Sequence, residues 1–457
     1  MNSNASRRAF LQRGAALSIA GSATPWALNL AAMGEAAAAT ASDYKAMVCV
    51  FLYGGNDYAN TLVPFDAASH AAYQGMRPSL AYSQAALAAT ALQPSQALPG
   101  GRQYALAPEL APLLPIFQAG RLGIQLNIGS LVQPTSKAQY QAKSVSLPPK
   151  LFSHNDQQSI WQSSSPEGAT SGWGGRIGDL FESGNGLSTF TCVNVSGNAV
   201  FLAGRSAVQY QVSSAGPVLL DGLKSPLFGS AACSEALRDI ISAPRSHWFE
   251  AEYSRVMQRS LGAGEVLTAA LAAAPALSTV FPAGNSLAAQ LRLVARMISN
   301  AQAIGAKRQV FFVSLGGFDN HDSLASDHPV LLSTVAEAMS AFYAATVELG
   351  VSQQVTSFTA SDFGRTMTGN DGSDHGWGGM HFMLGGAVQG GRFYGTPPVV
   401  ANNGPDDVGQ GRLLPSTSVD QYAATLGRWF GLSDSALLDV LPNLVNWNSS
   451  QRTLGFV

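Results

Sequence analysis

The chain has 457 residues, of which 46% are hydrophobic and only 12% are charged, and its formal net charge at pH 7 is −2. This composition excludes a disordered chain, gives enough length for a large buried core, and offers no electrostatic basis for nucleic-acid binding. The three cysteines lack metal-ligand spacing; Cys49 lies within an apolar stretch, whereas Cys192 and Cys233 could pair in an oxidising compartment.

Residues 1–41 have the pattern of an export signal. Arg7 and Arg8 precede Phe-Leu and an apolar run, 14–32, which a stretch of small residues follows. This order predicts a signal for the twin-arginine translocation machinery, so we expect residues 42–457 to reach the periplasm or the cell exterior. The alternative is an N-terminal membrane anchor, which the polar residues within the apolar run disfavour. No later segment is expected to span a membrane permanently.

Apolar strands alternate with amphipathic helices along the rest of the chain. Strands are expected at 45–53, 121–128, 189–195, 199–202, 309–315, from 355 and at 382–388, and helices at 106–119, from 153, after 172, and at 234–256, 267–274, 285–300, 330–349 and 419–429. This alternation favours one mainly parallel α/β sheet with helices on both faces. We expect a single domain over 42–457 with an insertion at about 196–285.

Three of the expected strands end in a carboxylate. The strands before Asp57 and Asp319 each run into two glycines, and the strand from Val355 ends in Ala-Ser-Asp at Asp362. In open α/β sheets, ligands bind outside the carboxyl ends of the strands. The three carboxylates are therefore expected to lie near one another and to form the centre of a site.

Imidazoles and further carboxylates surround these positions. The candidate metal ligands are Asp57, Asp319, His321, Asp322, Asp362, Asp374, His375 and His381. Carboxylates with imidazoles suit Zn, Mn or Fe, whereas carboxylates alone suit Mg or Ca. Arg365 could neutralise a carboxylate or bind an oxyanion. Each of these residues also has a structural explanation, because Asp, Asn and Gly are common in turns.

Ser153 and His154 lie where a helix is expected to begin. The N-terminal end of a helix favours an anion or a nucleophile. Ser153 and Asp156 have the spacing of a capping box, so Ser153 could also be a helix cap and nothing more.

These stretches resemble an exported bacterial family known as domain of unknown function 1501. The resemblance is carried by Gly54–Pro64, Leu151–Gln162, Gly172–Asp179, Gly316–Asp322, Ser361–Thr366, Ser373–Gly379 and Leu414–Gly431. The family looks related to the alkaline phosphatase and sulfatase superfamily. This relation implies a three-layer α/β/α sandwich with a metal site at the strand ends.

The resemblance also implies roles by position. Asp57, Asp319, Asp362 and His375 match metal ligands of the superfamily, and Ser153 falls near the place of its nucleophile. The Asp-His pair of the superfamily reads Asp-Phe here, at 362–363, so one imidazole is absent.

The sequence thus predicts an exported hydrolase-like protein that acts on small or polymeric phosphate or sulfate esters with a divalent metal, either Zn, Mn, Fe or Ca. The predicted ligands are Asp57, Asp319, His321, Asp362 and His375. Ser153 or His154 would be the nucleophile or base, and Arg365 would bind the oxyanion. The alternative, favoured by Phe363, is a non-catalytic binding or assembly protein that keeps the fold. A nucleotide-dependent oxidoreductase is disfavoured because Gly54-Gly55 lacks the Gly-x-Gly-x-x-Gly spacing.

Overall fold

The computed structural model describes residues 43–457, so the predicted export signal lies outside the described residues. Within them the main feature is a ten-stranded sheet with the order β11-β4-β10-β9-β1-β8-β5-β6-β7, in which β12 also pairs with β4. The strands are β1 (Lys45–Leu52), β4 (Leu122–Gly129), β5 (Cys192–Asn194), β6 (Tyr210–Ser213), β7 (Gly216–Pro217), β8 (Arg308–Leu315), β9 (Val355–Ser361), β10 (Gly379–Gly385), β11 (Arg392–Tyr394) and β12 (Thr417–Ser418). A separate pair is formed by β2 (Leu62–Pro64) and β3 (Tyr104–Leu106).

The sheet is mainly parallel, as the sequence predicts. β1 is parallel to both of its neighbours, with Lys45 opposite Arg308 on β8 and Ala46 opposite Val355 on β9. β10 runs antiparallel to β9 and β4, and β7 runs antiparallel to β6. The central strands β9, β1 and β8 therefore end at the same edge of the sheet.

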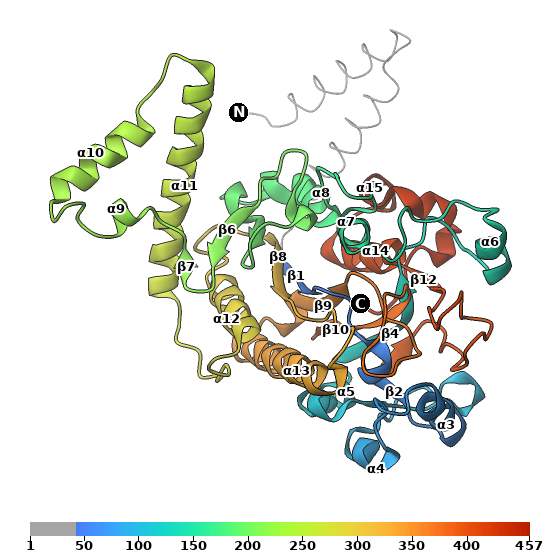
Figure 1. Ribbon diagram of the computed structural model, residues 1–457. Coiled ribbons are helices and arrows are strands. Elements are labelled where there is room, and N and C mark those ends of the chain that lie inside the picture. Colours follow the sequence, from blue (N-terminus) through green and yellow to red (C-terminus); the bar gives the residue numbers. More distant parts are fainter. Residues whose placement is uncertain (1–42) are drawn as a thin grey trace, which may run out of the picture.

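Helices cover both faces of this sheet (Figure 1). The longer ones are α3 (Ala67–Met76), α7 (His154–Ser163), α8 (Trp173–Phe181), α12 (Ser286–Ser299), α13 (Leu324–Glu348), α14 (Val419–Phe430) and α15 (Asp434–Val440), and the shorter ones are α4 (Gln84–Leu87), α5 (Leu114–Gln118) and α6 (Lys137–Ala142). Successive side chains of a strand point to opposite faces, and β1 divides accordingly. Val48 and Val50 belong to a core that includes α12 and α13, whereas Met47 and Phe51 belong to a second core with α8 and α14. The predicted three-layer sandwich is confirmed.

Glycine brings the ends of β1 and β8 together. Gly54 has a φ of +114°, and a Cβ atom there would lie 2.4 Å from the backbone nitrogen of Asp319. Only glycine adopts this conformation at this distance without strain. Gly54 is therefore required for the close approach of the two strand exits.

A helical arm, Asp221–Ala273, projects from the body of the protein (Figure 1). It contains α9 (Asp221–Lys224), α10 (Ala231–Ser242) and α11 (Trp248–Ala273), and it falls within the predicted insertion. The predicted helix boundaries were wrong here, because the break lies around Pro244 and α11 continues through two glycines. Proline disfavours helix at the preceding residue, whereas a glycine within a helix costs only about 1 kcal/mol.

Two further predictions need correction. The segment Val200–Leu202 is a 3-10 helix and not a strand, and α13 begins at Leu324, with Pro329 inside it. By length and composition α13 could cross a membrane, and it is the one helix of residues 43–457 that passes this test. Half of its most apolar window is buried, and it packs against α12, as the core helix of a soluble protein does. The absence of a membrane span stays a prediction.

The three cysteines are free. Cys49 and Cys192 are buried, and Cys233 on α10 is partly exposed. The pairing of Cys192 with Cys233, which the sequence left open, is not formed in the structure.

Candidate metal centre

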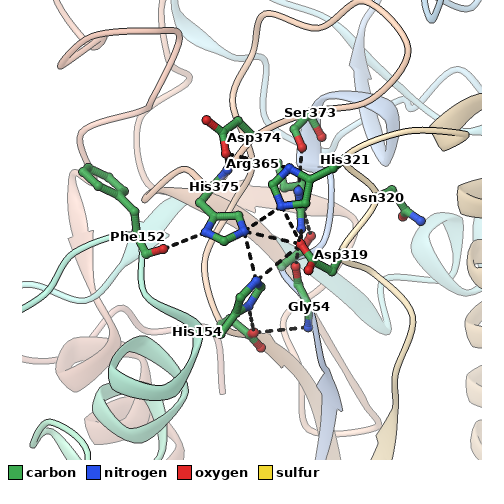
Figure 2. A network of polar contacts seen from close by, with 12 residues as sticks. Gly54, Phe152, His154, Asp319, Asn320, His321, Arg365, Ser373, Asp374 and His375 are labelled. Carbon is green, nitrogen blue, oxygen red and sulfur yellow. Dashed lines mark hydrogen bonds and ion pairs between the residues drawn. The ribbon is translucent and has the colours of Figure 1, made fainter.

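Three imidazole rings converge on one carboxylate oxygen at the C-terminal edge of the sheet (Figure 2). We call this group the histidine cluster, and its members are His154, His321, His375 and Asp319. The Nε2 atoms of the three histidines lie 3.3, 3.1 and 3.4 Å, in that order, from Oδ1 of Asp319. The Nε2 atom of His375 also lies 3.0 Å from that of His154 and 2.9 Å from that of His321. The sequence predicted three of these four residues as ligands and the fourth, His154, as a base.

The outer nitrogens of two of these rings fix their tautomers. Nδ1 of His375 lies 2.7 Å from the carbonyl oxygen of Phe152, which can only accept, so this nitrogen carries the proton. Nδ1 of His154 lies 2.6 Å from Oδ2 of Asp362, which makes it the donor in the same way. When these rings are neutral, each therefore presents an Nε2 lone pair to the centre of the cluster.

Facing lone pairs beside a carboxylate require a cation between them. The hydrogen bond to Asp362 raises the pKa of His154, whereas burial lowers the pKa of His375. Burial raises the pKa of Asp319, but the hydrogen bond and the charge of Arg365 outweigh it, so this pKa is lowered and the carboxylate is ionised. A proton shared by the cluster or a bound metal ion would each relieve the repulsion.

Asp362 lies behind the cluster and orients it. Its Oδ2 accepts from His154, from Nε2 of Gln158 at 2.8 Å and from the backbone nitrogen of Gly54 at 3.2 Å. Its Oδ1 is buried and has no hydrogen-bond partner among the described residues. Asp362 was predicted as a direct ligand, but its Oδ2 contacts the outer nitrogen of His154, and it belongs to neither candidate group of the described residues.

Arg365 fixes the loops around the site. Its buried guanidinium donates to the carbonyl oxygens of Gly54, Gly55 and Ser373 at 2.7, 2.9 and 2.5 Å, and also to Oδ1 of Asp319. These bonds use four of the five N–H groups of the side chain. The predicted oxyanion-binding role is therefore not matched, since Arg365 instead joins the exit of β1 to the carboxylate at the exit of β8.

Asp57 binds an arginine and not the histidines. Nη1 and Nη2 of Arg77 lie 2.8 and 2.7 Å from its two oxygens, and Ser373 donates to Oδ2 at 2.6 Å. Burial raises the pKa of Asp57, but Arg77 outweighs it and holds the pKa at about 2. Both groups of His and Asp side chains with the spacing of a metal site, among residues 43–457, exclude Asp57. No motif in the sequence pointed to Arg77, which lies directly after the Ala-rich α3.

The hydroxyl of Ser153 is directed to Asp156 and makes no hydrogen bond to the histidine cluster. Ser153 occupies the N-cap position of α7, as predicted, but its hydroxyl donates to Oδ2 of Asp156 at 3.0 Å and makes no cap hydrogen bond. His381 is buried against Thr359 and takes no part in the cluster, and Asp322 is likewise outside both candidate groups of the described residues.

Arg412, which the sequence did not indicate, lines the site beside Asp374, a candidate ligand that the sequence predicted. Arg412 donates from Nε to the carbonyl oxygen of His375 at 2.8 Å, approaches Asp374 at 3.4 Å, and lies over the ring of Phe152. It is partly exposed, so it is a cationic group beside the cluster that remains accessible. Asp374 lies 3.8 Å from Nδ1 of His321 and belongs to the second candidate group, with His321 and His375.

Phe363 lies where the superfamily pattern would place a histidine. Its ring centroid is 4.9 Å from those of His154 and His375. A Cβ atom on Gly55 would lie 2.4 Å from this ring, so glycine makes room for it. The aromatic side chain therefore packs against two rings of the cluster.

Comparison with known proteins adds to this description. The chain is similar to the solved structure of Ps i-CgsB in complex with k-i-k-neocarrahexaose, with 10% identity, a TM-score of 0.36, and coverage of 89% of this chain and 77% of that chain. It is also similar to PsFucS1 sulfatase from Pseudoalteromonas sp., with 10% identity, a TM-score of 0.32, and coverage of 91% and 72%. The second is named a sulfatase.

Among curated proteins, none matches this sequence. The model of the family described as "Protein of unknown function (DUF1501)" matches residues 44–441, which is most of the chain. The protein therefore belongs to the DUF1501 family.

Proposed function

We propose that the protein hydrolyses phosphate or sulfate esters with one divalent transition-metal ion held by the histidine cluster. The observation that supports this proposal is the convergence of three Nε2 atoms on Oδ1 of Asp319, with two of the rings fixed as Nδ1–H tautomers. Metal-bound histidines commonly donate their other nitrogen to a carboxylate or a carbonyl oxygen, as His154 and His375 do.

The donor atoms fit such an ion in kind and in spacing. Three imidazole nitrogens and one carboxylate oxygen suit Zn, Mn or Fe, whereas Ca prefers oxygen ligands throughout. Donors that each lie about 2.1 Å from one ion are roughly 3.0–3.4 Å apart. The five Nε2–Nε2 and Nε2–Oδ1 separations given above run from 2.9 to 3.4 Å.

The residues around the cluster have separate tasks in this proposal. Asp362 and the Phe152 carbonyl oxygen orient two imidazoles, and Arg365 keeps Asp319 ionised. A bound ion would supply Lewis-acid polarisation of the ester group. Arg412 is the side chain placed to bind a phosphate or sulfate oxygen, because it is partly exposed and adjoins His375. Since no hydrogen bond joins the Ser153 hydroxyl to the histidine cluster, we assign the attack to water and not to a covalent nucleophile.

A non-catalytic binding protein is the second candidate. Phe363 favours it, because the ring occupies the place of an expected ligand and lies against two of the histidines. In that case the cluster would hold a metal without turnover.

Metal analysis of the exported chain, purified without chelators, tests the proposal first. We expect about one equivalent of Zn, Mn or Fe in the natural chain and its loss in the His375→Ala and Asp319→Ala variants. His247→Gln is the matched control, because His247 is an exposed histidine at the start of α11, and this variant should keep the metal. A natural chain without metal would end the proposal.

A screen of aryl phosphates and aryl sulfates then separates the two candidates. An ester hydrolase should turn over one class, lose activity with His375→Ala, lose affinity for substrate with Arg412→Gln, and retain activity with Ser153→Ala. A metal-loaded protein that hydrolyses neither class would favour the binding protein.

A further inference from the structure

The helix α11 carries one mainly apolar stripe, which Ser260 interrupts. We call it the α11 stripe, and its positions, spaced alternately by four and three residues, are Phe249, Tyr253, Val256, Ser260, Ala263, Leu267 and Ala270. This heptad spacing places the side chains on one face, which is the pattern of a helix that packs lengthwise against another helix.

The two halves of the stripe have different surroundings. Ala263, Leu267 and Ala270 are buried against the body of the protein. Phe249 and Tyr253 are 64% and 58% exposed, although they continue the same face. The neighbouring α10 contains no buried residue. The outer part of the arm thus has an apolar face without a core to cover it, unlike the outer surface of most soluble proteins.

A hollow of about 510 Å³ lies between α10 and α11 at this outer end. It is lined by Ile240 and Ile241 of α10 and by Phe249 and Tyr253 of α11. Trp248 is 68% exposed and stacks on Phe249, with ring centroids 3.7 Å apart. Two stacked aromatic rings therefore lie beside an open hollow at the outer end of the arm, which leaves apolar surface uncovered there.

We propose that the helical arm is a dimerisation element, which packs against the arm of a second copy with the two α11 helices antiparallel. Glu252 and Arg259 lie seven residues apart along the same edge of the stripe. When two identical helices pack antiparallel about a two-fold axis, the same edges face each other. Glu252 of each copy then faces Arg259 of the other, and such flanking charges determine partner and orientation.

The charge of the arm is better suited to a second copy of the chain than to an anionic lipid surface or a nucleic acid. Asp221–Ala273 contains five Lys and Arg residues and six Asp and Glu residues, so its net charge is −1. Glu250 and Glu252 adjoin the aromatic rings and would repel an anionic lipid surface or a nucleic acid. A near-neutral surface that carries both signs is suited to a second copy of itself.

The exposed aromatic area at the outer end of α11 is consistent with a dimer interface. Trp248, Phe249 and Tyr253 are each more than half exposed, and three such aromatic rings present on the order of 400 Å². A standard interface buries about 800 Å² on each partner. The rings alone provide about half of this area, and the hollow and its flanking side chains adjoin them.

Analytical ultracentrifugation of the exported chain tests the proposal. We expect a dimer at micromolar concentration, with Tyr253→Glu monomeric at the same concentration. Phe228→Ser is the matched control, because Phe228 is 91% exposed in the arm but lies outside the stripe, and this variant should stay dimeric. Circular dichroism confirms that each variant is folded.

Charge reversal gives the sharper test. Glu252→Arg alone and Arg259→Glu alone should each weaken the dimer at least tenfold, because each places like charges opposite one another. The double variant should restore the dimer, as should mixing the two single variants. Loss of the Glu252–Arg255 pair within the helix would not be rescued in this way.

Three outcomes would overturn the proposal. They are a natural chain that is monomeric at all concentrations, a dimer that persists in Tyr253→Glu, and a monomer that instead binds phospholipid vesicles in a manner that depends on Trp248.

Discussion

Oδ2 of Asp362 lies 2.6 Å from Nδ1 of His154, although the two residues are 208 positions apart in the chain. The bond joins the C-terminal end of β9 to the first residue of α7. It links the strand that ends in a carboxylate to the helix that starts with an imidazole. The orientation of His154 toward the centre of the cluster depends on this bond.

The Asp362→Asn variant is expected to bind metal about 10- to 100-fold more weakly. The amide can still accept from Nδ1 of His154, but the negative charge that raises the pKa and the basicity of this ring is lost. Competition with a chelating dye measures the affinity. Gln158→Ala should cost less, because it removes only a second donor to the same oxygen. An unchanged affinity in Asp362→Asn would show that the charge of Asp362 does not strengthen metal binding through His154.

The Gly54→Ala variant is expected to lose metal, since its Cβ atom would lie 2.4 Å from the backbone nitrogen of Asp319. The backbone that carries Asp319 must then move. Gly316→Ala is the control within the second glycine pair, because a Cβ atom there would meet no atom within 4 Å. Metal content measured side by side should fall only for Gly54→Ala. Equal retention in both variants would contradict the tight approach of β1 and β8.

The Asp57→Asn variant is expected to be destabilised by about 3–5 kcal/mol, because it leaves the buried guanidinium of Arg77 without its charged partner. Urea denaturation measures this loss. The folded fraction should still bind metal, since Asp57 stands outside the histidine cluster. A stable variant without metal would instead restore Asp57 to the role of ligand that the sequence suggested.

The same ion pair predicts the behaviour of the protein in acid. The folded pKa of Asp57 is about 2, below the value of about 3.9 for an unfolded Asp. The stabilisation is therefore fully present above about pH 4 and is lost as the pH falls toward 2, with a magnitude on the order of 2 kcal/mol. Denaturation curves between pH 5 and pH 2 should show this loss in the natural chain, and a smaller pH dependence in Asp57→Asn.

The burial of His381 predicts a second loss of stability on acidification, which begins at a higher pH than the loss due to Asp57. Burial lowers the pKa of His381 to about 3, so the ring stays neutral in the folded protein while an unfolded histidine takes up a proton below about pH 6.5. The contribution of His381 to stability is therefore fully present above that pH, and it falls as the pH is lowered toward 3. Between pH 7.5 and 5 the His381→Gln variant should lose about 2 kcal/mol less than the natural chain in urea denaturation. An identical loss in both would contradict the burial of a neutral ring.

Much of the site could be predicted because it follows from local patterns. Apolar runs that end in Gly-Gly or Ala-Ser before an Asp predicted β1, β8 and β9, and the structure places these strands side by side. The roles of the carboxylates could not be predicted from such local patterns. Asp57 and Asp319 follow equivalent turns, yet one binds Arg77 and the other faces the histidines.

The sequence by itself determined the alternation of strands and helices, the edge of the sheet at which the carboxylates gather, and the family, because periodicity and turn residues act over a few positions. Only the tertiary structure decided which oxygen faces which imidazole and which apolar helix face stays uncovered. Those choices depend on residues that lie far apart in the chain, such as Arg77 beside Asp57 and Asp362 beside His154, and on packing that no local pattern specifies.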